Sequence, residues 1–214
     1  MQINSIFQNL FFCHLNNYFF SPVQFHVHYV TPKLIWADAG SGSAHDFACY
    51  TPDIPLYSEN LIIGHFGIRQ TSDGVKPETY VLSITGTHIH DVVRSPLSYI
   101  LIWYDKNSGA YKDGAMWKVK CPNGYDSLSD LCTSGYDDPP LDATVCINKT
   151  YLVSDRHDVL IYDIYPSNAD IHLDINGGGT YLTKELISVT TDRGTKKSLK
   201  AIKPNFISMY LNML

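Results

Sequence analysis

Two stretches of the chain decide the fold: residues 34–42 read LIWADAGSG, and residues 101–109 read LIWYDKNSG. Matching residues are 67 positions apart throughout, and the same spacing holds for Asp46 and Asp113 further along. Identities at so many positions of one frame indicate an internal repeat. A third, weaker copy begins with LIYD at residues 160–163 and lacks the Ser-Gly pair. We therefore expect repeats near residues 34–67, 101–140 and 160–191.

Each copy has the pattern of a β-hairpin. An apolar strand is followed by an Asp-x-x-Ser-Gly turn, in which the aspartate can accept backbone N–H bonds and the glycine can take a positive φ. A hairpin is marginally stable alone, so the three copies should pack their apolar faces on a common axis. The prediction is an all-β, β-prism-like arrangement of three small sheets, with a β-sandwich of duplicated halves as the alternative.

The composition agrees with an all-β fold. Of the 214 residues, 44% are hydrophobic, 13% aromatic and 17% charged, with 15 Tyr, 14 Gly and 11 Pro. A disordered chain would carry more charge, and a helical bundle would need more Ala, Leu, Glu and Lys. The net charge of −5 also argues against a nucleic-acid partner bound through its phosphates.

The first 31 residues differ from the rest because they contain no Asp, Glu, Lys or Arg. Histidine and asparagine interrupt their apolar run, so they resemble neither a signal peptide nor a transmembrane segment, which needs about 20 apolar residues. We expect an appended strand, a degenerate leader or a wrongly assigned start in residues 1–31. A single β-prism-like domain is expected over residues 32–214.

The chain has five cysteines, too few for a disulfide scaffold. Cys121 and Cys132 flank a Pro-Asn-Gly-Tyr turn, so a local disulfide between them is one expectation and two buried thiols are the other. Asn148 begins an Asn-Lys-Thr sequon and is a candidate glycosylation site, which counts only if the protein is secreted. The cellular compartment therefore stays open.

Several motifs together resemble the family of vacuolar protein sorting-associated protein 62 and its plant relatives. They are Ile-Trp-x-Asp-x-x-Ser-Gly-Ala-x-x-Asp, Pro-x-Gly-Tyr-x-x-Leu-x-Asp at residues 122–130, and Leu-Ile-Ile-Gly-His-Phe-Gly at residues 61–67. The similarity covers residues 32 to about 200, and it extends more distantly to β-prism modules that dock onto membranes. The resemblance implies a β-prism-like fold and a link to endosomal or vacuolar trafficking, but no reaction.

The repeated turns are the first candidate binding site. Their oxygens could surround a hard cation such as calcium or a sugar hydroxyl, although neither turn has the acidic density of dedicated calcium loops. The alternative is that these side chains only stabilise the turns. The candidate ligand-binding residues are Asp38, Ser41, Asp46, Asp105, Ser108 and Asp113.

A lysine cluster near the C-terminus is the second candidate site. Four lysines lie within nine residues of an otherwise acidic chain, and each could add about 1 kcal/mol of attraction to anionic lipid. The alternative is an edge strand protected by its lysines. The candidate lipid-binding residues are Lys196, Lys197, Lys200 and Lys203.

No catalytic signature is evident, because the chain contains neither a Gly-x-Ser-x-Gly elbow nor a P-loop. We therefore expect a non-enzymatic binding module without a cofactor or metal, at a peripheral endosomal or vacuolar location or outside the cell. Its partner would be a membrane surface, a glycan or a protein. The alternatives are a hydrolase that uses polar residues at the repeat turns, and a secreted glycan-binding or defence protein.

Overall fold

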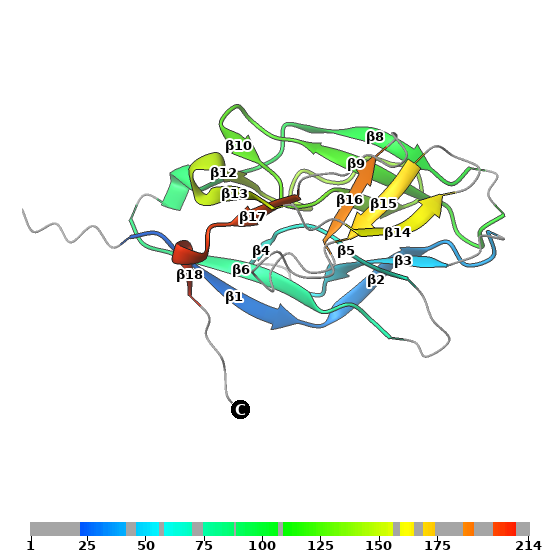
Figure 1. The fold of residues 1–214 in the computed structure, drawn as a ribbon, viewed down its shortest axis with the longest axis horizontal. Helices are drawn as coiled ribbons and strands as arrows, with labels where there is room; N and C mark the ends of the chain where they lie inside the picture. Colours follow the sequence, from blue (N-terminus) through cyan, green and yellow to red (C-terminus); the bar gives the residue numbers. More distant parts are fainter. Residues whose placement is uncertain are drawn as a thin grey trace, which may run out of the picture.

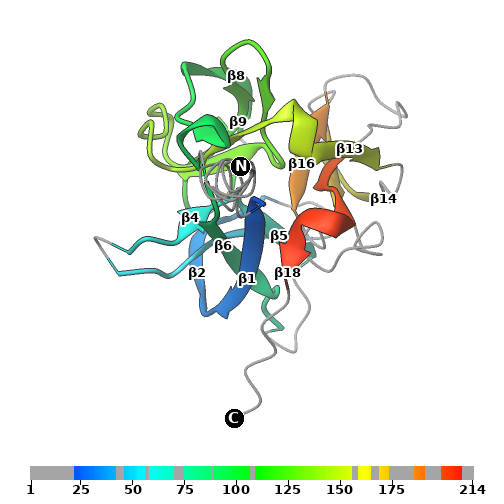
Figure 2. The same cartoon turned by 90° about the vertical axis from the view of Figure 1, so that its left-hand side faces the viewer.

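The computed structural model describes residues 22–41, 46–55, 58–69, 75–87, 89–106, 109–155, 159–164, 169–173, 186–190 and 199–208. Within these residues the chain forms strands and short 3-10 turns, and no α-helix (Figure 1). The strands fall into three successive groups, which we call lobe 1 (residues 22–87), lobe 2 (residues 89–148) and lobe 3 (residues 149–208). Viewed along the long axis, the lobes surround a common centre (Figure 2).

Lobe 1 contains two small sheets, with strand orders β2-β3-β5 and β1-β6-β4. Their pairings are antiparallel, and β18 from the end of the chain adds to β1 in parallel. The strands are β1 (Gln24–Val30), β2 (Pro32–Ala37), β3 (Phe47–Pro52), β4 (Leu61–Ile62), β5 (Phe66–Arg69) and β6 (Thr79–Thr85).

Lobe 2 has the same strand connections as lobe 1, with orders β8-β9-β11 and β10-β12-β7. A 3-10 turn, η1 (Ile89–Asp91), precedes its first strand. The strands are β7 (Val93–Arg94), β8 (Ser98–Tyr104), β9 (Gly114–Lys120), β10 (Tyr125–Asp126), β11 (Leu131–Ser134) and β12 (Cys146–Asn148).

Lobe 3 contains the sheets β14-β15-β16 and β13-β17. It begins with the 3-10 turn η2 (Lys149–Tyr151) and ends with η5 (Pro204–Phe206) and β18 (Ile207–Ser208). Its remaining strands are β13 (Leu152–Asp155), β14 (Val159–Ile164), β15 (Ala169–Leu173), β16 (Ile187–Thr190) and β17 (Leu199–Ile202).

A register shift occurs in the first hairpin of each lobe. It lies between Leu34 and Trp36 in β2, and at the corresponding places in β8 and β14. A bulge redirects the side chains that follow it, so three successive apolar residues need not alternate strictly between faces. In lobe 1 this places Trp36 in the interior, where it is only 1% exposed. The Leu-Ile-Trp pattern is thus explained by the bulge.

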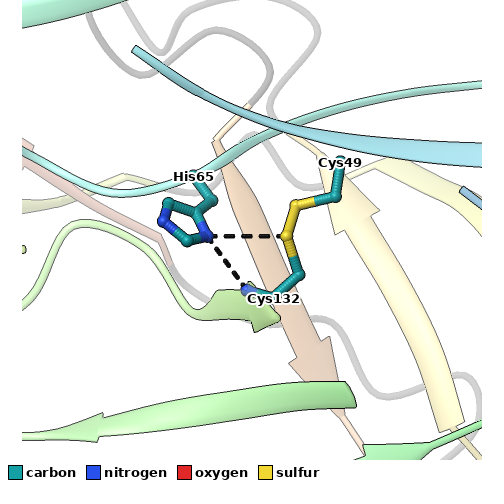
Figure 3. Close-up of side chains that lie close together, drawn as sticks. All are labelled: Cys49, His65 and Cys132. Carbon is teal, nitrogen blue, oxygen red and sulfur yellow. Dashed lines mark hydrogen bonds between the residues drawn. A yellow bond between two sulfur atoms is a disulfide. The ribbon is translucent and has the colours of Figure 1, made fainter. Parts of the chain in front are cut away.

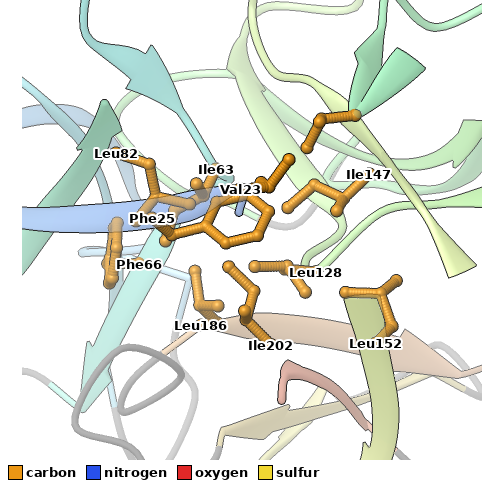
Figure 4. Packing of buried hydrophobic residues seen from close by; sticks show 11 residues of the cluster. Val23, Phe25, Ile63, Phe66, Leu82, Leu128, Ile147, Leu152, Leu186 and Ile202 are labelled. Carbon is orange, nitrogen blue, oxygen red and sulfur yellow. The ribbon is translucent and has the colours of Figure 1, made fainter. Parts of the chain in front are cut away.

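The central hydrophobic cluster is built by all three lobes (Figure 4). Each fully buried side chain of this size contributes about 1.5–3 kcal/mol relative to an exposed position, so the lobes stabilise one another. The buried members are Val23, Phe25, Ile63, Phe66 and Leu82 from lobe 1, Val92, Leu128 and Ile147 from lobe 2, and Leu152, Leu186 and Ile202 from lobe 3.

The prediction of an all-β, β-prism-like fold is confirmed, with one refinement. Each lobe carries two small sheets where one was expected, because the strands on either side of each first hairpin pair with one another as a second sheet. Within the part of the chain that the structure describes, no helix has the length and apolarity needed to cross a membrane.

Of the three alternatives for residues 1–31, a strand is present: β1 precedes the expected domain start at residue 32 and belongs to the fold. All seven residues of β1 pair with β6, and Phe25 is completely buried in the central cluster. The lack of charged residues here reflects a strand whose inner face is covered by the core. Residues 1–21 lie outside the described part of the chain.

Candidate functional site at the hairpin tips

The hairpins β2–β3 and β8–β9 end side by side at one end of the molecule (Figure 1). The Tyr111 N–H donates to the Ala39 carbonyl at 3.0 Å, and Trp36 Nε1 donates to the Lys112 carbonyl at 2.8 Å. Gly40 has φ +89°, and a Cβ there would lie 2.9 Å from the Tyr111 ring. Any other residue at position 40 would therefore strain the backbone at this positive φ, and its Cβ would clash with the Tyr111 ring.

Asp38 and Asp105 close the two hairpins in the same way. The backbone of Asp38 donates to the Phe47 carbonyl at 3.1 Å, and its Oδ1 accepts the Phe47 N–H at 2.5 Å. Asp105 makes the same pair of bonds with Gly114, at 3.0 and 2.8 Å. Both aspartates are buried. Each carboxylate thus accepts a backbone N–H inside its own hairpin. This is the turn-stabilising role that was the alternative to ligand binding.

Burial changes the acidity of these carboxyl groups. It raises the pKa of Asp38 to about 6, with a smaller contribution from the negative charge of Asp46 and opposition from the Phe47 N–H. Burial also raises the pKa of Asp105, and Asp113 adds to that shift. Asp38 therefore changes its protonation state in the weakly acidic range.

The other residues predicted for the turns lie at or near these aspartates. Ser41 Oγ donates to Asp38 Oδ2 at a long 3.5 Å, and Asp46 is half-buried. Asp113 is exposed, and Ser108 lies outside the described residues. Among the described residues, Asp38 and Ser41 thus belong to one turn and Asp105 to the other, and each of these aspartates bonds within its own hairpin.

Three exposed tyrosines that the sequence motifs did not indicate lie in the hairpin β8–β9 or just after β11. Tyr111 is 85% exposed, Tyr104 47% and Tyr136 38%. The rings of Tyr104 and Tyr136 meet edge to face with centroids 5.7 Å apart. Partial burial, and then a hydrogen bond to Asp113, raise the pKa of Tyr136 to about 12, so its hydroxyl stays protonated. We call Tyr104, Tyr111, Asp113 and Tyr136 the tip surface.

The cysteine pairing expected from the sequence is wrong. Cys121 pairs with Cys146, and Cys132 pairs with Cys49. Cys132 lies in β11, and its side chain reaches Cys49 in lobe 1. Cys121 follows β9, and its side chain reaches Cys146 at the start of β12. The short spacing of Cys121 and Cys132 was therefore misleading, because the strand arrangement separates their side chains.

His65 lies against the Cys49–Cys132 disulfide (Figure 3). Its Nδ1 accepts the Cys132 N–H at 3.1 Å and lies 3.5 Å from Cys132 Sγ. Desolvation lowers the pKa of this fully buried imidazole to about 3, so it is neutral at physiological pH. In the sequence, His65 stands out only as part of the motif at residues 61–67, and its spacing from the cysteines does not indicate a contact with them.

Residues 25–177 match the family of vacuolar protein sorting-associated protein 62. The chain belongs to the Vps62 family. The resemblance inferred from the repeated motifs is thereby confirmed, and the match includes β1 from its second residue onward.

A solved structure resembles this member of the Vps62 family over most of its length. The crystal structure of GNIP1Aa from Chromobacterium piscinae matches 86% of the chain with a TM-score of 0.66 and 19% identity. The chain spans only 38% of that protein chain, so the likeness concerns the fold. No curated protein matches the sequence.

The lysines predicted to bind lipid in this Vps62 family member are only partly described. Lys196 and Lys197 lie outside the described residues, and Lys200 lies in β17 opposite Ser154. Lys203 Nζ donates to the Thr150 carbonyl at 2.7 Å. At least one of the four ammonium groups therefore has a structural role, and lipid binding stays a prediction.

Asn148 caps the turn η2. Its Oδ1 accepts the Thr150 N–H at 3.0 Å and the Thr150 hydroxyl at 2.9 Å, while its Nδ2 donates to the Asp91 carbonyl at 3.2 Å. Glycosylation of Asn148 stays a prediction.

Proposed function

We propose that the chain is a non-enzymatic binding module of vacuolar or endosomal protein sorting, and that its tip surface recognises a neutral glycan. The observation that carries this proposal is the set of exposed tyrosine rings of the tip surface, of which Tyr111 lies where the two hairpins meet. Tyrosine presents a large ring with only two side-chain torsions, so it makes contact area at a small entropic cost. A ring whose backbone is hydrogen-bonded at the hairpin junction, as that of Tyr111 is, is suited to binding.

The chemistry of the tip surface fits a sugar. Aromatic rings can stack on the C–H faces of a pyranose, while carboxylates and phenol groups bond its hydroxyls. Asp113 offers exposed carboxylate oxygens next to Tyr136, and the Tyr111 ring lies over Gly40. Of the six residues predicted to bind a sugar hydroxyl, this proposal keeps Asp113 and adds its tyrosine neighbours.

Charge favours a neutral glycan over an anionic membrane as the partner of this surface. The two turns, residues 38–46 and 105–113, carry four aspartates against two lysines. Anionic lipid would be repelled there, since polybasic segments are what such lipid attracts. An anionic membrane would instead be attracted by the C-terminal lysines, which are distant in the sequence from both turns.

The hydrolase alternative requires carboxyl groups with raised pKa values that converge on one pocket. Asp38 and Asp105 do have raised pKa values, but each is bound by the backbone of its own hairpin. Turn stability accounts for the backbone bonds of both carboxylates, and Asp105 makes one further bond, with the Tyr136 hydroxyl. This weighs in favour of a binding module.

The test is a glycan array followed by calorimetric titration of the best neutral glycan. Tyr111→Ala should weaken binding at least about tenfold, as expected for a central aromatic contact. Tyr29→Ala is the matched control, because Tyr29 is 63% exposed in a different sheet and should leave the affinity unchanged. Adding calcium or a chelator should not change the affinity, because Asp38 and Asp105 are engaged in the turns.

A second arm separates the other partners. The proposal is overturned if no glycan binds, or if both tyrosine variants bind equally well. In that case anionic liposomes become the next probe. Co-sedimentation that is lost when Lys196, Lys197, Lys200 and Lys203 are replaced by Gln would assign lipid binding to the C-terminal cluster.

A further inference from the structure

We propose that Cys49, Cys132 and His65 form a zinc site when the Cys49–Cys132 disulfide is reduced. The three residues come from different parts of the chain: Cys49 from β3, His65 from the segment between β4 and β5, and Cys132 from β11. Cys49 and His65 belong to lobe 1 and Cys132 to lobe 2. A metal here would therefore replace one cross-link between these lobes with another.

The distances suit a tetrahedral metal. The two sulfur atoms and the imidazole nitrogen all lie within 4.8 Å of one another. With Zn–S near 2.3 Å and Zn–N near 2.05 Å, tetrahedral geometry requires an S···N separation of about 3.6 Å. Cys132 Sγ and His65 Nδ1 are already 3.5 Å apart. After reduction the two sulfurs need to separate only to about 3.8 Å.

The imidazole of His65 is in the form that binds metals. Burial keeps it neutral, and Nδ1 accepts a hydrogen bond from the Cys132 N–H, so the ring proton resides on Nε2. The Nδ1 lone pair thus already points toward Cys132 (Figure 3). Zinc would take this lone pair in place of the N–H, at the cost of one ordinary hydrogen bond.

A neighbouring cavity provides access and room for a further ligand. Its volume is about 320 Å³, and it is lined by both His65 and Cys132. Asp137 and Asp138 also line it and are exposed, so they would attract a cation toward the entrance. Three protein ligands with a water molecule in the fourth position complete a common coordination of zinc.

The reaction balances in two steps. A dithiol gives two electrons and two protons to the disulfide, which becomes two thiols, while the dithiol leaves as its own disulfide. Zinc then binds as the thiols lose their protons, so two protons are released for each metal bound. In the reverse direction, a small disulfide accepts two electrons from the thiolates and leaves as two thiols, while the zinc ion is released and the Cys49–Cys132 bond forms again.

The second disulfide serves as an internal comparison. Among the described residues, the group that could share a metal is Cys49, His65 and Cys132, and the Cys121–Cys146 pair is not in such a group. If zinc binding followed from reduced cysteines alone, both pairs would bind. The proposal instead assigns the metal to the pair that has the histidine.

The experiment uses the full chain with Cys13→Ser, in its oxidised form and after reduction with a phosphine. Each form is incubated with zinc and passed through a desalting column, and bound metal is measured by mass spectrometry. We expect one zinc per reduced chain and essentially none per oxidised chain. Cobalt in place of zinc should give the charge-transfer absorption of thiolate ligands and the visible bands of a tetrahedral site.

Two variants assign the ligands. His65→Gln should weaken zinc binding by more than roughly 100-fold, because losing a ligand costs more than losing a residue that only orients one. The matched control with both Cys121→Ser and Cys146→Ser should bind like the parent. Comparing the reduced and oxidised forms of the Cys13→Ser protein needs no change at a ligand residue, so poor folding of His65→Gln leaves the test intact. The proposal is overturned if the reduced parent retains no zinc, or if His65→Gln binds it equally well.

Discussion

At the scale of the residue, Asp38 links folding to pH. Burial raises its pKa in the folded protein to about 6 from the ordinary value of 3.8. Between these pH values the folded state binds more protons than the unfolded state, so the free energy of unfolding falls as pH rises. The stabilising contribution is complete below about pH 4 and is lost as pH rises through 6.

Replacing Asp38 with asparagine should remove this dependence. The amide oxygen of the new side chain can still accept the Phe47 N–H, but the side chain no longer ionises. We expect Asp38→Asn to reduce the loss of stability between pH 4 and pH 7 by about 2 kcal/mol, measured by urea unfolding at both pH values. Asp53→Asn, at an exposed position, is the control. An unchanged pH dependence in Asp38→Asn would disprove the assignment.

At the scale of the element, the hairpins β2–β3 and β8–β9 are held together by Trp36. Its indole donates to the Lys112 carbonyl and lies so close to Gly114 that a Cβ there would overlap the ring. We expect Gly114→Ala to cost about 1–3 kcal/mol of stability in urea unfolding, as overpacking usually does. Because the clash involves the indole, combining Gly114→Ala with Trp36→Phe should cost less than the sum of the single changes. Purely additive costs would mean that the two residues do not meet.

The same elements show what the sequence could predict. The hairpins could be predicted because the Leu-Ile-Trp run and the turn aspartate recur with a constant spacing, and Asp38 and Asp105 make equivalent hydrogen bonds in the structure. The role of the aspartates in the turns could be predicted because their hydrogen-bond partners lie in the same hairpin, only nine residues away in the sequence. The bulge between Leu160 and Tyr162 lies in the segment assigned to the third copy.

The remaining features depend on contacts between distant segments. The lack of charged residues in positions 1–31 indicated a segment separate from the domain. In the structure, β1 lacks charge because it pairs with β6 and contributes to the core. Cys49 and Cys132 are 83 residues apart, and their pairing depends on how lobes 1 and 2 meet. Tyr136 reaches the tip surface from the end of β11, which no pattern within the turns could indicate.

At the scale of the whole molecule, residues 186 and 187 join the three lobes. Leu186 is completely buried and forms an isolated bridge with Phe66 of lobe 1. The Ile187 N–H donates to the His65 carbonyl at 3.1 Å, and the Ile187 carbonyl accepts the Asp130 N–H of lobe 2 at 2.9 Å. These contacts, with the shared central cluster, make independent unfolding of one lobe unfavourable.

Leu186→Ala should therefore destabilise the entire molecule by about 2–5 kcal/mol, because it leaves a cavity in a core that every lobe lines. Tryptophan fluorescence reports on lobes 1 and 2 through Trp36, Trp103 and Trp117, whereas far-ultraviolet circular dichroism reports on all strands. Both probes should give one coincident urea transition in the parent and in the variant. Leu97→Ala, at a residue 59% exposed, should shift the transition by less than about 0.5 kcal/mol. Fluorescence and circular dichroism transitions that separate in Leu186→Ala would show that lobe 3 unfolds on its own, and the shared core would then not be what couples the lobes.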